Sequence, residues 1–339
     1  ISQIVKKQYG EIFIYDLNVR YTALATEEDK QRVMNILNEN DNLESYLAGT
    51  EINAKLRGKG DDIPVTLIIP SDPARLREYI TLRDRNSQIP VKISDKGIVI
   101  SEKLAKELNA GSGDTVELDN GDGARKKVVI SGIAENYIFH YAYMTPDYYN
   151  EIFRLNPKIN NLMVKLDEAG TEAEHKLGSL LIKDEGVGSV VYYSAAAAYF
   201  KDTVKILNSI VIVIIISAGL LALVVMYNLT NINIGERIRE IATIKVLGFY
   251  DHEVSAYVYR ENMVISIIGS IAGLFAGTFL HRYIMVSIEQ EEVMFGSHID
   301  GISFVYSFLI TMGFVVLVNI LMYRRLKNIP MVESLKSVE

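Results

Sequence analysis

Three long runs without a charged residue dominate the C-terminal part of the chain. They cover residues 206–235, 262–281 and 301–323 and are 30, 20 and 23 residues long. A helix needs about 20 mostly apolar residues to cross the hydrocarbon core of a bilayer. Very apolar helices buried in a soluble core are the alternative, but three such runs so close together favour the membrane. We therefore predict three transmembrane helices, at about 206–229, 262–284 and 302–323.

The pattern before residue 205 is different, because short alternating runs typical of strands are interspersed with segments of helical period. The predicted strands cover 11–21, 47–56, 65–69, 97–100, 116–118, 127–133, 162–166 and 189–193. The predicted helices cover 27–38, 102–108, 147–154 and 172–182. Residues 195–207 are expected to form one helix that runs directly into the first span. The fold class is thus an α+β domain, residues 1–200, followed by an all-α membrane domain, residues 201–339.

The average composition hides this division, because the mean hydropathy is only +0.15 and charged residues make up 23%. The last 134 residues hold 9 of the 35 Lys and Arg and 11 of the 42 Asp and Glu, so the charges concentrate in the first part. A net charge of −7 counts against a nucleic-acid partner, since binding to phosphates needs clustered Lys and Arg. With no cysteine in the chain, disulfides, Fe–S clusters, Cys zinc sites and Cys nucleophiles are excluded.

Positive charge gathers on one side of the predicted spans. The basic residues between the first and second spans and after the third are Arg237, Arg239, Lys245, Arg260, Arg324, Arg325, Lys327 and Lys336. The connection between the second and third spans carries Glu289, Glu291, Glu292 and Asp300 instead. Because Lys and Arg mark the cytoplasmic side, we predict a multi-pass membrane protein with these connections in the cytoplasm. Residues 1–205 are then extracytoplasmic and the C-terminus is cytoplasmic.

The sequence lacks the motifs of nucleotide, metal and catalytic sites. No GxxxxGK[ST] occurs, and Gly58-Lys59-Gly60 has neither the spacing nor the hydroxyl of a phosphate-binding loop. His252-Glu253 resembles the start of HExxH, but Ala256 stands where the second His is needed. The five His lie in five separate segments. We therefore predict no enzyme activity, metal or cofactor in this chain, and expect any ATP to be bound by a partner subunit.

The second span carries three glycines at four-residue spacing: Gly269, Gly273 and Gly277. Such a stripe lets another helix pack closely, so we predict that these residues form a helix-packing surface. The alternative is that glycine is simply frequent in membrane helices.

The connection after the first span has helical amphipathic character. Ile234, Ile238, Ile241 and Ala242 share one face, while Glu236, Arg239 and Glu240 lie on the other. Gly248 is expected to end this helix. The helix could simply lie along the membrane surface, or it could dock a cytoplasmic partner.

The same segment carries a family resemblance. Residues 236–248 read ERIREIATIKVLG, which resembles the "RxREIaxlkalG" signature of FtsX/MacB-type ABC transporter permeases. Arg260-Glu261, the glycine stripe and the ending Pro330-Met331-Val332-Glu333-Ser334-Leu335 agree with that family in order and spacing. The resemblance implies that this helix contacts an ATPase. The residues it assigns to that contact are Glu236, Arg237, Arg239, Glu240, Ile241, Lys245, Leu247 and Gly248.

The family has a transmembrane helix before the large domain, and this chain begins Ile1-Ser2-Gln3 without one. We therefore expect a piece that begins inside a longer protein. Either the missing helix precedes Ile1, or the chain is the C-terminal module of a two-module permease, which we favour.

The first domain carries a looser resemblance. The phrase GIVISEKLAKELNAGSGDTVEL followed by KKVVISGI resembles the small β-rich subdomain of MacB-type periplasmic core domains. It implies a porter-like α/β subdomain built from about 1–93 and 157–200, with an insert at about 94–156.

Four aromatic residues in this insert are predicted to alternate along one strand face: Tyr137, Phe139, Tyr141 and Tyr143. Aromatic residues on a strand more often belong to a core. If that face is exposed, it is the leading candidate for an outer contact surface.

Together these features predict a permease subunit or module that couples ATP hydrolysis by a partner to a change in its outer domain. The expected partners are a cytoplasmic ABC ATPase dimer, a second permease module or copy, the bilayer, and an extracellular protein or peptide. The expected outcome is export of a peptide or lipid-linked cargo, or activation of an extracellular partner. The alternative is a membrane-anchored sensor or binding receptor without ATP coupling. A membrane-tethered enzyme would need a catalytic constellation that the sequence lacks.

Overall fold

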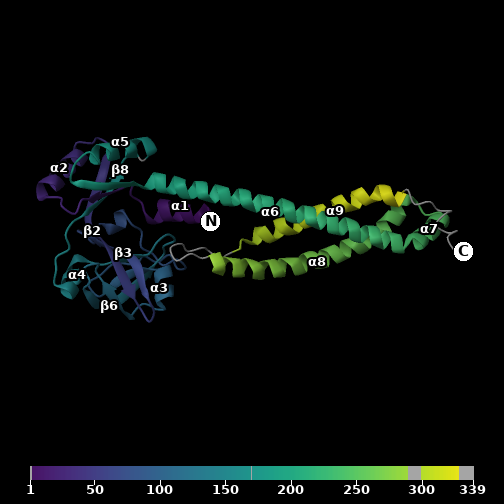
Figure 1. Cartoon of the computed structure of the whole chain (residues 1–339), viewed down its shortest axis with the longest axis horizontal. Helices are drawn as coiled ribbons and strands as arrows, with labels where there is room; N and C mark the ends of the chain where they lie inside the picture. Colours follow the sequence, from purple (N-terminus) through teal and green to yellow (C-terminus); the bar gives the residue numbers. More distant parts are fainter. Residues whose placement is uncertain (1, 169, 289–298, 328–339) are drawn as a thin grey trace. The chain divides into compact units, whose positions relative to one another are not determined.

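The computed structural model describes residues 2–168, 170–288 and 299–327 (Figure 1). These residues form two compact units that divide at Lys205 and Ile206. We call residues 2–205 the N-terminal domain and residues 206–288 with 299–327 the membrane region. Each unit is described by itself.

The N-terminal domain combines nine strands with short helices. Its helical elements are α1 Ser2–Lys7, the π-helix η1 Gln8–Ile12, α2 Glu27–Asn38, the 3₁₀ helix η2 Leu76–Glu78, α3 Glu102–Leu108, α4 Pro146–Phe153 and α5 Thr171–Leu181. Its strands are β1 Leu17–Tyr21, β2 Leu43–Arg57, β3 Asp62–Pro70, β4 Ile98–Ser101, β5 Thr115–Asp119, β6 Arg125–Ala134, β7 Tyr141–Tyr143, β8 Asn161–Leu166 and β9 Val187–Tyr192. The predicted α+β class is confirmed.

The long strand β2 belongs to two sheets at once. Residues 43–49 pair with β8, which continues through β1 to β9, and all these pairs are antiparallel. Residues 49–57 pair with β3, and residues 55–57 also pair with β5. The order β2, β3, β7, β4, β6, β5 and back to β2 closes a ring of strands. The segment 94–156 therefore supplies four of the ring strands, and β2 and β3 supply the other two.

Two apolar cores fill these sheets. Inside the ring, Leu56, Leu67, Ile100 and Leu118 are fully buried. On the open sheet, α2 and α5 cover one face and bury a separate core around β1, β8 and β9. Residue Thr26 caps α2 with a reciprocal capping box with Asp29, which fixes where that helix begins.

A third cluster, which we call the aromatic joint, lies where the chain enters α6. It comprises Tyr9, Phe13, Tyr15, Tyr193 and Phe200. The Tyr193 ring lies 4.5 Å from that of Tyr15 and 5.5 Å from that of Phe13, while Tyr9 stacks on Phe200 at 5.9 Å between ring centroids. The hydroxyls of Tyr15 and Tyr193 are hydrogen-bonded. The first turns of α6 are thereby packed against the core of the N-terminal domain.

One predicted strand is partly wrong. Residues 11–21 were expected to be extended, but residues 8–12 form η1 and the strand begins only at Leu17. The cause is tertiary: the buried Gln8 side chain bonds to Asn136 and to the backbone of Tyr137. These long-range bonds hold the backbone in a turn that the local pattern does not show.

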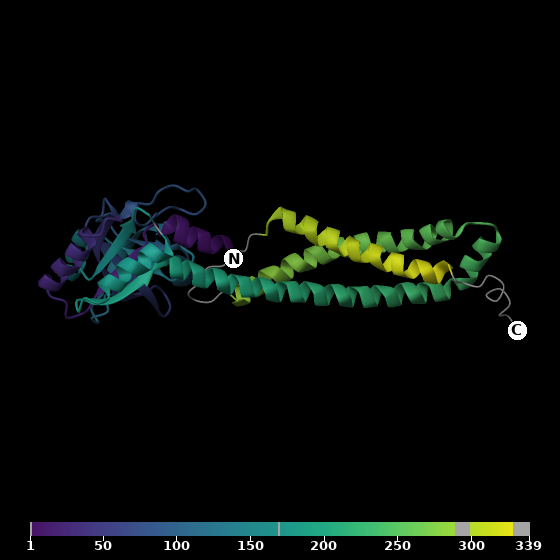
Figure 2. The ribbon, with the colours of Figure 1, turned by 90° about the horizontal axis from the view of Figure 1, so that it is seen from above.

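The membrane region consists of four helices: α6 Tyr193–Glu236, α7 Ile238–Val246, α8 Asp251–Ile288 and α9 Gly301–Lys327. Stretches long and apolar enough to cross a membrane lie at Asn208–Glu236, Met263–Ile284 and Gly301–Tyr323, and their side chains are mostly exposed. The predicted three membrane-capable helices are confirmed. Helices α8 and α9 lie side by side in both views (Figures 1 and 2).

Candidate functional site

Helix α7 is set off from its neighbours by two local backbone features. Residue Arg237, with φ −102° and ψ 15°, separates it from α6. At the other end Gly248 has φ +95°, the N–H of Gly248 donates to the carbonyl of Lys245, and the N–H of Phe249 donates to that of Ile244. This is the Schellman arrangement, in which glycine avoids the Cβ strain of a left-handed backbone. Gly248 therefore ends the helix as the sequence predicted.

One face of α7 packs on the other helices of the membrane region. Ile241 and Ala242 are fully buried and Ile238 is half-buried, as the amphipathic pattern predicted. They join a core that also contains Ile234 of α6, together with Val254, Val318 and Met322 of α8 and α9. Ile241 of α7 thus shares one buried apolar cluster with residues of α6, α8 and α9.

Residue Lys245 is buried, with 6% of its surface exposed, although the family resemblance assigned it to the ATPase contact. Its long aliphatic stem allows it to pack beside Ile241. In this structure Lys245 belongs to the packed face of α7, so its assigned contact with an ATPase stays a prediction that the geometry does not favour.

The opposite face of α7 is open. Arg239 and Glu240 are exposed and Glu236 is exposed beside them, whereas Arg237 is half-buried. Beyond them Leu247 is 73% exposed. The polar side predicted from the sequence is therefore available for a partner.

Sequence reasoning missed three apolar residues next to Leu247. Val246, Phe249 and Tyr250 are all mostly exposed, and they surround Gly248. We call Val246, Leu247, Phe249 and Tyr250 the apolar turn. Exposed apolar patches of this kind mark interaction surfaces. The signal was present in the sequence, since two aromatic residues directly follow the glycine that ends the helix.

The glycine stripe of α8 faces open space. Around Gly269, Gly273 and Gly277 no heavy atom of the described residues lies within 4 Å of the place where a Cβ would be. Close helix packing occurs elsewhere, because a Cβ at the buried Gly219 of α6 would collide with the ring of Phe314 in α9. The stripe stays a predicted packing surface, whereas Gly219 permits close contact between α6 and α9.

The four aromatic residues of segment 137–143 do not share one strand face, which corrects that prediction. Only Tyr141 and Tyr143 lie in β7. Tyr143 is buried, and Tyr137 is buried with its hydroxyl bonded to Glu135. Phe139, at φ +59°, is 45% exposed. Of the four residues predicted to form an outer contact surface, Phe139 is thus the one that is exposed.

The turn before β7 is held by buried polar groups. The carboxylate of Glu135 is fully buried and accepts hydrogen bonds from Tyr137 and, at 2.6 Å, from Nε of Arg83. Lys7 Nζ lies 3.4 Å away. Burial alone would raise the pKa of Glu135, but the bonds from Tyr137 and Arg83 outweigh it and hold the pKa below the usual 4.5.

A stability prediction follows from this carboxylate. A folded-state pKa below the unfolded value stabilises the fold above pH 4.5, and that contribution is lost as the pH falls through the folded pKa. We expect Glu135→Gln to lower the stability by about 2 kcal/mol at pH 7, because it removes charge-assisted hydrogen bonds. The deficit should shrink as the pH falls below 4.5. Thermal melts of wild type, Glu135→Gln and the exposed control Glu28→Gln at pH 7 and pH 3.5 measure this, and an unchanged deficit at both pH values would contradict it.

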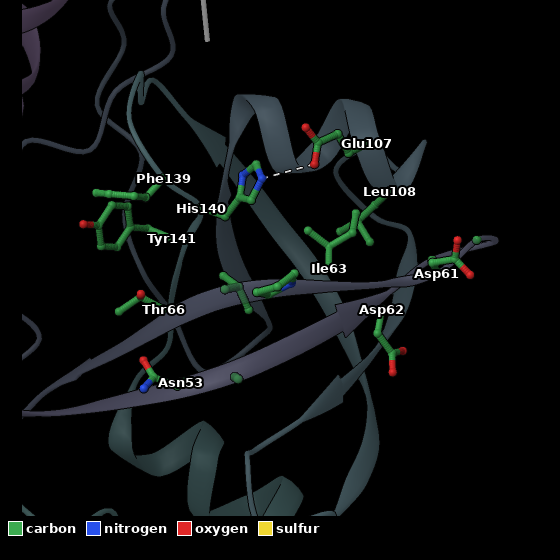
Figure 3. Close-up of a pocket in the computed structure, with 15 residues that line it drawn as sticks. Asn53, Asp61, Asp62, Ile63, Thr66, Glu107, Leu108, Phe139, His140 and Tyr141 are labelled. Carbon is green, nitrogen blue, oxygen red and sulfur yellow. Dashed lines mark ion pairs between the residues drawn. The ribbon is translucent and has the colours of Figure 1, made fainter. Parts of the chain in front are cut away.

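A cavity of about 770 Å³ lies beside Phe139 (Figure 3). Its walls come from the β2–β3 hairpin, the end of α3 and residues 139–141. The buried His140 has its Nε2 3.1 Å from Oε2 of Glu107. Among the residues that the structure describes, no three His, Asp or Glu side chains are grouped so that they could hold a metal ion.

The fold and the three apolar helices define a multi-pass membrane protein with an α+β domain. Residues 212–331 match the model of the FtsX-like permease C-terminal family. The matched residues include α7 and most of the three membrane-capable stretches. This part of the chain is thus similar to FtsX-like permeases, and the resemblance seen in the signature is confirmed.

Two solved structures are similar to the N-terminal domain. The periplasmic region of MacB from Actinobacillus actinomycetemcomitans is 13% identical with a TM-score of 0.34, over 58% of this chain and 97% of that chain. The extracellular domain of the noncanonic ABC-type transporter YknZ from Gram-positive bacteria is 16% identical with a TM-score of 0.33, over 52% of this chain and 98% of that chain. A comparison with curated proteins found no match.

Proposed function

We propose that this chain is a permease subunit or module that couples ATP hydrolysis by a separate ATPase to a conformational change of its N-terminal domain. The observation that carries the proposal is the two-sided character of α7. Its buried face shares one apolar cluster with residues of α6, α8 and α9, while its charged side and the apolar turn are exposed. A helix anchored in this way can be displaced by a partner and can transmit that displacement to the helices it packs on.

The helix α6 can transmit that displacement to the N-terminal domain. It is one continuous helix from Tyr193 to Glu236, so its first turns belong to the N-terminal domain and its end lies next to α7. A helix resists bending over this length unless a proline or an inserted group interrupts it, and α6 contains no proline. Movement of α7 would therefore be transmitted along α6 to the aromatic joint.

The orientation follows from charge. The basic residues around α7 place it in the cytoplasm, which puts the N-terminal domain outside. In this arrangement ATP is bound by the partner, an ABC ATPase dimer, and a second permease module or copy completes the pair. The cargo is a peptide or lipid-linked compound, or the moving domain activates an extracellular protein.

The exposed charges of α7 test this proposal directly. We expect Arg239→Ala/Glu240→Ala to reduce recovery of the ATPase at least tenfold, because two charge-assisted contacts of about 1 kcal/mol or more are lost together. The measurement is co-purification from native membranes in mild detergent, with the recovered ATPase identified by mass spectrometry. The matched control is Lys30→Ala/Glu27→Ala, which removes an exposed ion pair on α2 of the N-terminal domain. Undiminished recovery with the α7 variant would show that these residues do not make the contact.

A further inference from the structure

Helix α6 begins in the N-terminal domain, and groups from other elements hold its first residues. The N–H of Tyr193, the first residue of α6, donates to the carbonyl of Asp16 at 2.9 Å. The next residue, Ser194, has its N–H nitrogen 3.4 Å and its Oγ 2.5 Å from the same carboxylate oxygen of Glu174. The first N–H groups of a helix have no partner within the helix, so these bonds replace the missing ones.

Glu174 is unusual for this position because its side chain is buried. It lies in the first turn of α5, and only 2% of its surface is exposed. Burying a carboxylate is costly unless hydrogen bonds or an opposite charge offset the loss of water. The two bonds from Ser194 offset part of that cost.

The described elements that pack on α5 keep their cations away from Glu174. Strand β9 contains no charged residue, and its Tyr192 ring lies 4.4 Å from that of His175 between centroids. In β1, Arg20 pairs with Glu51 instead. On α2, Arg32 pairs with Asp184, which follows the last turn of α5, whereas Glu174 lies in the first turn.

The surroundings of Glu174 favour its protonated form. Burial raises the pKa of Glu174 above the usual 4.5, and the nearby charge of Asp16 raises it further. The bonds from Ser194 and the neighbouring His175 lower the pKa, but they do not outweigh the burial. A carboxylate is therefore placed where a neutral carboxyl group is more stable.

Asp16 adds a second carboxyl group to this junction. Its Oδ2 accepts a hydrogen bond from the N–H of Leu166 in β8 at 2.8 Å. Burial raises the pKa of Asp16, against the bond from Leu166 and the charge of Lys165, and Glu44 of β2 adds to the rise. Two carboxyl groups that both favour a proton thus lie where α6 is fixed to the N-terminal domain.

We propose that Glu174 and Ser194 form a proton-sensitive clamp that fixes the start of α6 to the N-terminal domain. When Glu174 takes up a proton, the cost of burying its charge is removed, while its carboxyl group still hydrogen-bonds with Ser194. Because the pKa of Glu174 is higher in the clamp than the usual 4.5, the attachment gains stability as the pH falls from neutral, and the gain is complete below pH 4.5. The clamp needs no nucleotide or ATPase, so it holds or fails independently of the coupling proposed above.

A spin label on α6 tests the clamp, since the sequence contains no cysteine and a single introduced thiol is labelled specifically. The label is placed at Ala198→Cys, an exposed position in the second turn of α6, in the full chain in nanodiscs. Electron paramagnetic resonance spectra between pH 7.5 and pH 4.5 give the ratio of mobile to immobile label. We expect this ratio to fall with falling pH, by up to about tenfold per pH unit, the limit for one proton.

A second label separates the clamp from a general change of the domain. Gln31→Cys is exposed on α2, away from the start of α6 in the sequence, and its spectrum should not change over the same pH range. Equal changes at both positions, or an unchanged ratio at Ala198→Cys, would overturn the proposal.

Four variants identify the group that takes up the proton. Glu174→Gln keeps the shape without the charge, so we expect an immobile label at every pH, whereas Glu174→Ala removes the partner of Ser194 and should leave the label mobile at every pH. Glu172→Gln is the matched control, because Glu172 is exposed in the same turn of α5, and it should keep the wild-type response. Asp16→Asn should move the midpoint of the response to lower pH, since the charge of Asp16 raises the pKa of Glu174. The Gln31→Cys label in each variant verifies that the domain is folded, and a wild-type pH response in folded Glu174→Gln would refute the assignment.

Discussion

Replacement of Leu247 by aspartate is expected to reduce recovery of the partner ATPase by more than tenfold. Leu247 is 73% exposed at the centre of the apolar turn, so it is free to insert into a partner. Burying a leucine side chain contributes about 1.5–3 kcal/mol, and a carboxylate in its place adds a desolvation cost. Each 1.4 kcal/mol changes the dissociation constant tenfold, so even the lower figure predicts a loss that is easily measured.

The measurement is the same co-purification from native membranes, with the amount of permease as the internal standard. Leu24→Asp is the matched control, because Leu24 is 90% exposed in the N-terminal domain and should not meet a cytoplasmic protein. Leu247→Asp should leave the fold intact, since no core cluster contains Leu247. Full recovery with this variant would mean that the apolar turn is not part of the contact.

The exposure of the apolar turn depends on tertiary packing, whereas the end of α7 depends on a local preference. The end of α7 was predictable because glycine is the residue that accepts φ +95°, and this preference is local. The exposure of Phe249 and Tyr250 is not local, because it depends on which side of α7 the other helices occupy. For the same reason Lys245 looked available in the sequence and is buried in the fold.

Local patterns were sufficient to predict two helices of the N-terminal domain. The expected helices at 27–38 and 147–154 are observed as α2 Glu27–Asn38 and α4 Pro146–Phe153, and Thr26 and Thr145 accept backbone hydrogen bonds where these helices begin. In contrast, the π-helix at residues 8–12 depends on Gln8 reaching Asn136, which lies 128 positions further along the chain. A periodic pattern cannot report a bond over that distance, so an extended strand was the natural but wrong prediction.

The glycines show the same limit. Regular spacing indicates that another helix can pack closely against Gly269, Gly273 and Gly277. It does not show whether a helix packs there. Gly219 has no such spacing, yet the Phe314 ring lies against it. Which glycine packs against another helix depends on how each helix is rotated about its axis. That rotation is set by packing between helices rather than by the sequence of a single helix.

The closed ring of strands could not be predicted from local sequence patterns either. Strand β2 was predicted as one segment, and its division between β8 and β3 follows from the way both sheets share it. As a result the cavity lies between residues 53–66, the end of α3 and residues 139–141, which are far apart in the sequence. Of the lining residues, the sequence analysis named Phe139 and Tyr141, and the conformation of Phe139 depends on Asn136, whose Nδ2 donates to the carbonyls of Ile138 and Phe139.

Loss of the aromatic joint should separate ATPase binding from movement of the N-terminal domain. The ring of Tyr193 packs on Tyr15 and Phe13, and its backbone N–H donates to Asp16 at 2.9 Å. We expect Tyr193→Ala to cost about 2 kcal/mol, since the ring is half-buried and a full aromatic truncation costs about 3–5 kcal/mol. For a domain of this size that lowers the melting temperature by about 4–8 °C.

The functional consequence is specific, because the joint is where α6 is fixed to the N-terminal domain while α7 lies at its other end. Recovery of the ATPase should stay at the wild-type level in Tyr193→Ala. With a non-hydrolysable ATP analogue bound, hydrogen exchange in β1 and β9 should change in wild type and not in the variant. Tyr199→Ala is the control, because Tyr199 lies on the same helix and is 71% exposed. The same nucleotide-dependent exchange in Tyr193→Ala would mean that α6 does not carry the motion, even if the ATPase contact at α7 proves correct.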